Sequence, residues 1–145
     1  MNTPILFVFS FLLCLSSAKI SVNEAMKAVR SITGTFDTAF LEGDKPLILQ
    51  QFRKNKSEYV ACDKVPSYGI PKIRDILHAS YSRYHMDNIK LHEKSITFDF
   101  YHYVSSKNQE VTYLTKGNMT LEKDDDGKSF YVRRYNQGCP KKLSG

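Results

Sequence analysis

The spacing of apolar residues changes once along this chain, from three and four residues to two, and this change restricts the fold more than any other feature. Through residues 21–41, apolar side chains recur at three- and four-residue steps, which predicts one long amphipathic helix with a single buried face. After Tyr84 they alternate with polar neighbours, which predicts antiparallel strands. The chain is therefore expected to be α+β, with helices packed on one sheet.

Capping residues support two helices at the start of this domain. Ser21 and Glu24 have the spacing of a capping box, and Gly43 suits the end of the long helix. Asp44 is placed to cap a short second helix that begins near Pro46.

A third helix and several strands are expected further along. The helix follows a turn at residues 67–71, has Pro71 in its first turn, and has an apolar side made of Ile70, Ile73, Ile76, Leu77 and Tyr81. The expected strands are residues 58–62, a segment around 89–91, and residues 96–100, 111–121 and 129–135. Gly117 predicts a bulge within its strand, and residues 105–108 and 124–127 predict turns.

The first residues are typical of a secretory signal peptide. An apolar run at residues 4–15 is followed by the small residues Ser16 and Ala18, so we expect cleavage after Ala18. Residues 1–18 would then be a leader, and residues 19–145 would form one secreted, extracellular domain. The run is shorter than the roughly 20 residues of a membrane-spanning helix, and no second run follows it, so no membrane span is expected. Because no Lys or Arg precedes the run, an uncleaved anchor is the alternative.

Export of the chain from the cytosol would allow its cysteines to form disulfides and its sequons to be glycosylated. Cys14 would leave with the leader, while Cys62 and Cys139 would remain in a compartment that oxidises thiols. They either pair with each other or leave one thiol to bridge to another chain. An internal pair closes a long loop, worth on the order of 4 kcal/mol in the chain-entropy model. Asn55 and Asn118 each begin an N-glycosylation sequon.

The net charge of +6 is a moderate excess whose commonest meaning is solubility. The pairs Arg133-Arg134 and Lys141-Lys142 could touch phosphate, but no motif of stacking aromatic residues accompanies them. Nucleic acid is therefore not an expected partner.

No metal site or cofactor is expected. His78, His85 and His92 are seven residues apart, but the predicted structure changes from helix to strand between them, so they should not share a face. The acidic segment 122–127 resembles the opening of a calcium loop, yet Arg133 stands where a bidentate Glu is required. A hairpin turn is the expected structure there.

Three segments resemble the nuclear transport factor 2-like superfamily. FDTAFLEGDKPLILQQF (36–52) resembles that family's helix–Gly-Asp–helix junction, EYVACD (58–63) its first strand, and SYGIPKIRDIL (67–77) the entry to its third helix. The resemblance implies a cone-shaped, cystatin-like fold in which three N-terminal helices close over a curved, mainly antiparallel sheet. The chain is also similar to secreted nematode members with cysteines and no assigned activity. In this fold the first and last strands lie close, which would bring Cys62 and Cys139 together.

The resemblance also suggests where chemistry could occur. Ketosteroid isomerases, dehydratases and polyketide cyclases of this superfamily use an Asp or His inside the cone for proton transfer. Asp63, at the end of the first strand, and His102, in the alternating run that includes Phe98 and Phe100, are the candidates. A satisfied core histidine and a polar strand-end residue are the respective alternatives.

Four tyrosines on the predicted strands could line a cavity that suits an apolar ligand with one or two polar groups: Tyr101, Tyr103, Tyr113 and Tyr131. Core or surface packing explains them equally well.

The leading hypothesis is a secreted, non-enzymatic binding domain whose partner is a small apolar ligand, another protein or a second copy of the chain. One alternative is a lyase or isomerase that uses His102 or Asp63. Another is a cystatin-like protease inhibitor, because Gln109, Val111 and Tyr113 resemble a Gln-x-Val-x-Gly hairpin that here lacks its Gly.

Overall fold

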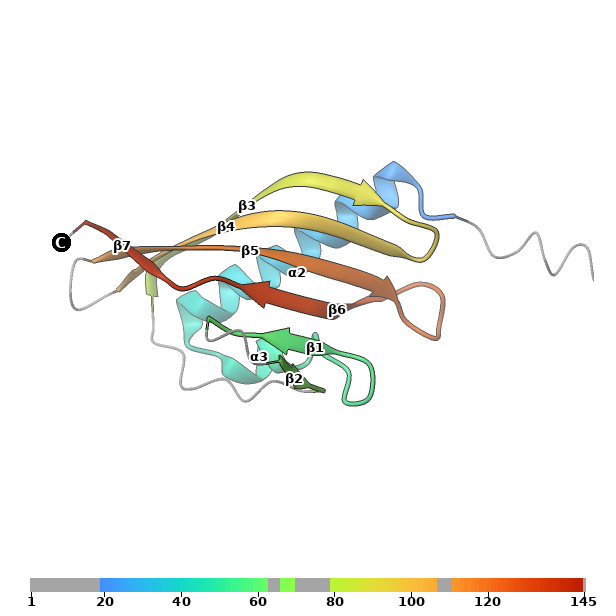
Figure 1. Cartoon of the computed structure of the whole chain (residues 1–145), viewed down its shortest axis with the longest axis horizontal. Helices are drawn as coiled ribbons and strands as arrows, with labels where there is room; N and C mark the ends of the chain where they lie inside the picture. Colours follow the sequence, from blue (N-terminus) through green and yellow to red (C-terminus); the bar gives the residue numbers. More distant parts are fainter. Residues whose placement is uncertain (1–18, 63–65, 70–78, 107–110, 145) are drawn as a thin grey trace, which may run out of the picture.

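A seven-stranded sheet carries one long helix across one of its faces (Figure 1). The computed structural model describes residues 19–62, 66–69, 79–106 and 111–144. The helices are α2 (Val22–Glu42) and α3 (Lys45–Leu49), and the strands are β1 (Glu58–Val60), β2 (Pro66–Tyr68), β3 (Ala79–Leu91), β4 (Ser95–Ser106), β5 (Thr112–Lys123), β6 (Phe130–Gln137) and β7 (Lys141–Ser144). Their order is β2-β1-β6-β5-β4-β3, with β7 also paired to β5. Within these ranges no helix is long and apolar enough to cross a membrane, and the expected leader lies outside them.

The predicted caps are confirmed. Ser21 accepts a hydrogen bond from the backbone of Glu24, whose side chain returns one to Ser21, so α2 begins with a complete capping box. Gly43 ends α2 in the left-handed conformation. Asp44 accepts from the N–H of Leu47 at 3.1 Å and thereby caps α3.

The prediction of three N-terminal helices is wrong in part. Two helices, α2 and α3, occur in the described ranges. Most of the expected third helix lies outside those ranges, but its last predicted position, Tyr81, is in β3. Pairing with β4 overrides the helical spacing there, because Ser82 and Tyr84 alternate inward from the start of the strand. The polar Ser82 hid that alternation in the sequence.

The inner face of the sheet forms the core with α2. On β4 the buried residues alternate as predicted, and they pack against the apolar side of the helix. The largest members of this core that are fully buried are Phe36, Phe98, Phe100, Ile96, Met119 and Leu121. The opposite face of the sheet has no helix of the described residues on it (Figure 1).

A parallel pairing between β1 and β6 brings the cysteines together. Tyr59 lies opposite Tyr135, so the two strands end at the same side of the sheet. Cys62 and Cys139 follow them, with their Cα atoms 4.5 Å apart, and form a disulfide. The internal pairing is therefore the one that this fold contains. The other strand pairings are antiparallel.

The strands also differ from prediction in extent and number. Strand β3 begins at Ala79 rather than near residue 89, and Ser105 and Ser106, expected in a turn, belong to β4. Residues 66–68 form β2, although residues 67 and 68 were expected in a turn, and β7 was not predicted. The bulge predicted at Gly117 is instead a register shift between Thr120 and Leu121. Gly117 has another role, because a Cβ atom there would lie 2.2 Å from the carbonyl oxygen of Asn136 and 2.6 Å from the ring of Phe100.

Replacing Gly117 therefore tests the packing of β5 between its neighbours. We expect Gly117→Ala to lower the free energy of unfolding by about 1–3 kcal/mol, because the methyl group overpacks the core. Gly34→Ala is the matched control: Gly34 lies in α2 with open space around it, so alanine should raise stability by about 0.5–1 kcal/mol. Urea denaturation measures both changes, and equal effects of the two substitutions would contradict this register.

Candidate functional site

His102 is the candidate catalytic residue that the structure describes, and it lies on the inner face of β4. Its exposed fraction is 4 %, and its neighbours in the alternation, Phe98 and Phe100, are buried on the same face. Asp63 lies outside the described residues. Of the two predicted acid–base residues, only the histidine can be placed.

A hydrogen-bonded chain links His102 to helix α2. The hydroxyl of Ser82 on β3 donates to Oδ1 of Asp37 at 2.8 Å and lies 2.9 Å from Nε2 of His102. Because Ser82 has one proton and donates it to Asp37, Nε2 of His102 is the donor in the second bond. Asp37 Oδ2 also accepts from the backbone N–H of Tyr84 at 3.3 Å. The carboxylate thus joins the helix to β3 and, through Ser82, to β4.

Aromatic side chains enclose the imidazole. The ring of Tyr84 stacks on His102 with 3.9 Å between centroids, and Phe40 of α2 meets it edge-on at 4.7 Å. The hydroxyl of Tyr84 lies 2.8 Å from that of Tyr135 on β6. Burial raises the pKa of both phenols, so they remain protonated and hold this contact over the physiological range.

Burial shifts the pKa of the imidazole and the pKa of the carboxyl in opposite directions. It lowers the pKa of His102 to about 3, so the ring is neutral at physiological pH. Burial raises the pKa of Asp37, while its hydrogen bonds from Ser82 and Tyr84 oppose that rise. The side chain of Asp37 keeps 22 % of its surface exposed. Of the three hydrogen-bonded groups, Asp37, Ser82 and His102, the carboxyl of Asp37 is the one that solvent or a ligand can reach most readily.

The arrangement can take up a proton at Asp37 without moving heavy atoms. With Asp37 ionised, the bonds run from His102 through Ser82 to the carboxylate. If Asp37 binds a proton, the hydroxyl oxygen of Ser82 can accept hydrogen bonds from both the carboxylic acid and Nε2 of His102, because it has two lone pairs. The cluster Asp37–Ser82–His102 can therefore accept or return one proton at the exposed carboxyl.

The four candidate tyrosines do not share one surface. Tyr101 and Tyr103 alternate with His102 and lie on the opposite face of β4, where Tyr101 is beneath Lys116 and Tyr103 meets the ring of His85. Tyr113 is paired with Val104 and shares the face of His102.

Tyr131 is buried on β6, and the side chains of Arg53 and Lys56 lie 5.6 and 5.8 Å from its ring centroid. It therefore fills space between β6 and the segment after α3. A ligand-binding role for any of the four tyrosines stays a prediction.

The described histidines do not meet at one place. His85 is on the outer face of β3, and His92 contacts Thr97 at 3.0 Å near the β3–β4 turn, while His78 lies outside the described residues. Within the described ranges no three His, Cys, Asp or Glu residues gather as a metal site. The acidic segment forms the expected turn, in which Gly127 donates to the carbonyl of Asp124.

Sequence reasoning missed Asp37 and Ser82, and helical spacing could have indicated the first. Asp37 lies four residues after Thr33 and three before Phe40, on the side of α2 that faces the sheet. A charged residue on an apolar helix face is a signal for a buried polar contact. Ser82 carried no such signal.

No protein-family model matches this chain, and no curated protein matches it. Solved structures do match it in fold. An NTF2-like protein with a cystatin-like fold from Novosphingobium aromaticivorans has a TM-score of 0.61 at 10 % identity, covering 81 % of this chain and 82 % of that one. The fold is nuclear transport factor 2-like.

Two further NTF2-like structures carry the names of enzymes. A ketosteroid isomerase-like protein from Erwinia carotovora atroseptica has a TM-score of 0.58 at 14 % identity and covers 85 % of this chain and 99 % of that one. A type 2 hexachlorocyclohexane dehydrochlorinase has a TM-score of 0.54 at 10 % identity and covers 83 % of this chain and 89 % of that one. At these identities the matches establish the fold alone.

The buried imidazole predicts a pH-dependent stability. Between pH 6.5 and about 3 the unfolded chain binds a proton at His102 that the folded chain does not bind. The stabilisation is therefore complete above pH 6.5 and is lost as pH falls toward 3. Asp37, with a raised pKa, contributes with the opposite sign just above its ordinary pKa of 3.8.

His102→Gln tests this, because an amide can bond to Ser82 but does not titrate. The free energy of unfolding of the parent, minus that of the variant, should fall by about 1.4 kcal/mol per pH unit between about pH 6 and pH 4. Making both proteins in an Asp37→Asn background removes the carboxyl titration. Parallel pH profiles for the parent and the variant would contradict a neutral buried imidazole.

Proposed function

We propose that the protein is a secreted binding domain that holds a small, largely apolar ligand through Asp37. The observation that supports this most is the accessibility of that carboxylate: 22 % of the side chain is exposed, whereas His102 behind it is sealed. Ser82 and the N–H of Tyr84 fix its orientation. An oriented carboxylate beside aromatic side chains is suited to a ligand that has one polar group on an apolar body.

The charge of Asp37 selects the polar group of the ligand. An ionised carboxylate only accepts hydrogen bonds, so the ligand must supply a donor, either an ammonium or a hydroxyl group. The ammonium is the stronger partner because its hydrogen bond is charge-assisted. A carboxylate ligand would be repelled.

The state of His102 favours binding over catalysis. Its pKa of about 3 keeps it from acting as an imidazolium acid at neutral pH, and the proton on its Nε2 is already donated to Ser82. Tyr84 and Phe40 cover the ring on two sides. The imidazole thus serves to position the carboxylate rather than to meet a ligand.

A lyase or isomerase is the second candidate, and the accessible, oriented carboxylate of Asp37 favours it. Asp37 could remove a proton next to a carbonyl group while Ser82 and His102 adjust their hydrogen bonds. The fold neighbours named as a ketosteroid isomerase-like protein and a dehydrochlorinase make this chemistry worth testing. Gln109 of the inhibitor-like segment lies outside the described residues, so that alternative rests on the sequence alone.

Four naphthalene probes test the binding proposal by calorimetry. We expect affinity to decrease in the order 1-naphthylmethylamine, 2-naphthol, naphthalene, 1-naphthoate. Asp37→Asn should weaken binding of the amine about tenfold, because it removes the charge-assisted bond, and should leave naphthalene unchanged. Asp87→Asn, which alters an exposed aspartate of β3, is the matched control.

Two results would overturn the binding domain. Equal affinity for the amine and for naphthalene would exclude Asp37 as the polar contact. Asp37-dependent conversion of a β,γ-unsaturated ketone to its conjugated isomer would show that the protein is an isomerase and not only a binding domain.

Secretion is supported by the leader-like residues 1–18 and by the disulfide, which suits an oxidising compartment. When the full chain is expressed in animal cells, we expect the medium to contain a protein that begins at Lys19. Its intact mass should rise by two hydrogens on reduction of Cys62–Cys139. An intracellular chain that retains residues 1–18 would refute secretion.

A further inference from the structure

The turn after α3 presents Asn55 to solvent on a fixed backbone. Ser57 Oγ accepts from the backbone N–H of Arg53 at 2.7 Å, and the N–H groups of Lys56 and Ser57 both donate to the carbonyl of Arg53. Asn55 lies at the middle of this turn, and its side chain is exposed. Three of its neighbours in the turn, Arg53, Lys56 and Ser57, therefore hold the backbone around it.

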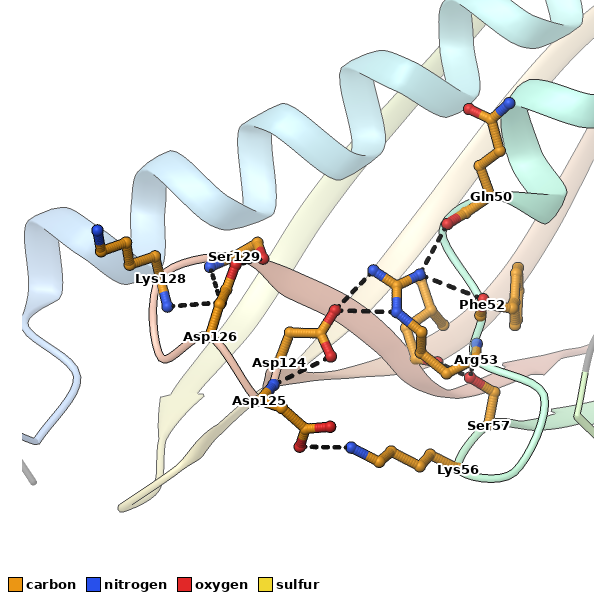
Figure 2. Close-up of polar contacts among 11 residues, drawn as sticks. Gln50, Phe52, Arg53, Lys56, Ser57, Asp124, Asp125, Asp126, Lys128 and Ser129 are labelled. Carbon is orange, nitrogen blue, oxygen red and sulfur yellow. Dashed lines mark hydrogen bonds and ion pairs between the residues drawn. The ribbon is translucent and has the colours of Figure 1, made fainter.

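Ion pairs fasten this turn to the β5–β6 turn, as Figure 2 shows. Arg53 donates to Asp124 from two nitrogens at 2.7 and 2.9 Å, and Lys56 contacts Asp125 at 2.7 Å. The guanidinium also donates to the carbonyl of Gln50. A group attached at Asn55 would consequently project from a rigid platform.

A hollow of about 400 Å³ lies beside Asn55, and Tyr68 forms part of its wall. Tyr68 is 79 % exposed, so one of its faces is open to a group placed beside it. Gly69 keeps Tyr68 close to the turn. The N–H of Gly69 donates to the carbonyl of Ser57 at 2.7 Å, and a Cβ atom at Gly69 would lie 2.5 Å from the carbonyl oxygen of Lys54. Arg133 also lines the hollow and can donate to a ligand.

We propose that Asn55 carries an N-linked glycan whose first N-acetylglucosamine packs against Tyr68 in this hollow. The inference rests on the proposed secretion, which brings the sequon Asn55-Lys56-Ser57 to the glycosylating enzyme. The donor is an oligosaccharide linked to a lipid diphosphate. The amide nitrogen of Asn55 bonds to C1 of the sugar and loses a proton, while the C1–O bond breaks and the lipid diphosphate leaves with the electron pair.

The burial of Ser57 determines when this happens. The sequon hydroxyl is needed for transfer, but in the folded protein Ser57 is 2 % exposed and donates to the carbonyl of Val132 at 2.6 Å. Val132 lies in β6, far along the chain. Transfer to Asn55 therefore precedes the docking of β6, and the sugar then settles against Tyr68 as the turn forms.

The second sequon provides an internal reference. Asn118 lies on the outer face of β5, between Asp99 and Asn136, and its side chain is exposed. A sugar there would stand on the sheet, outside the hollow that contains Tyr68.

The test uses protein secreted from animal cells, with residues 1–18 replaced by the leader of an unrelated secreted protein, so that failure of the native leader does not affect it. Glycopeptide mass spectrometry measures occupancy, with Asn55→Gln as the control. An endoglycosidase then trims each glycan to one N-acetylglucosamine, whose acetyl methyl signal is followed by NMR. We expect an upfield ring-current shift at Asn55 that is lost in Tyr68→Ser and retained in Tyr81→Ser, an exposed tyrosine on the opposite edge strand.

Each outcome decides the proposal. An unmodified Asn55 in the secreted protein overturns the modification itself. A modified Asn55 whose acetyl signal is the same in the parent and in Tyr68→Ser overturns the packing. A shift at Asn55 that depends on Tyr68, while any sugar at Asn118 is unaffected, supports both parts.

Discussion

The contact between Asp37 of α2 and the first half of β3 is the interaction on which the rest of the molecule depends. The hydrophobic effect that holds the helix on the sheet is non-directional, whereas hydrogen bonds specify which groups lie opposite each other. Bonds from Ser82 and from the backbone of Tyr84 to one carboxylate set the position of the helix. That position in turn places Phe40 against His102 and closes the aromatic enclosure.

The same contact contains the carboxylate at which we propose that the ligand binds. A carboxylate that is half in the core costs desolvation free energy, which its hydrogen bonds offset only in part, so its pKa is raised. A chain selected for stability alone could bury an apolar residue at position 37. The cost is understandable if the carboxylate also meets a ligand, and the neutral imidazole behind it keeps the orientation without adding a competing charge.

Local signals predicted local structure well, and contacts between distant residues were beyond them. Each correct prediction depended on residues that are close together in the sequence. These predictions were the capping box at Ser21, the end of α2 at Gly43 and the alternation around Phe98. The helical spacing failed at Tyr81, because pairing with β4 places this residue in a strand. His102 was found because it interrupts an apolar alternation. Its partners were missed, since Asp37 and Ser82 reach it only through tertiary packing.

The disulfide constrains one part of the molecule covalently and leaves the other part without such a constraint. The segment between Cys62 and Cys139 contains β2 to β6 and is a covalently closed ring, whereas α2 and α3 lie before it. Apart from the stretch of chain that leads from α3 to Cys62, only non-covalent contacts attach the helices to that ring. Partial opening of the native protein should therefore begin with the helices moving away from the sheet. The disulfide limits how far the strands inside the ring can separate. The inner face of the sheet would then be exposed to solvent without global unfolding.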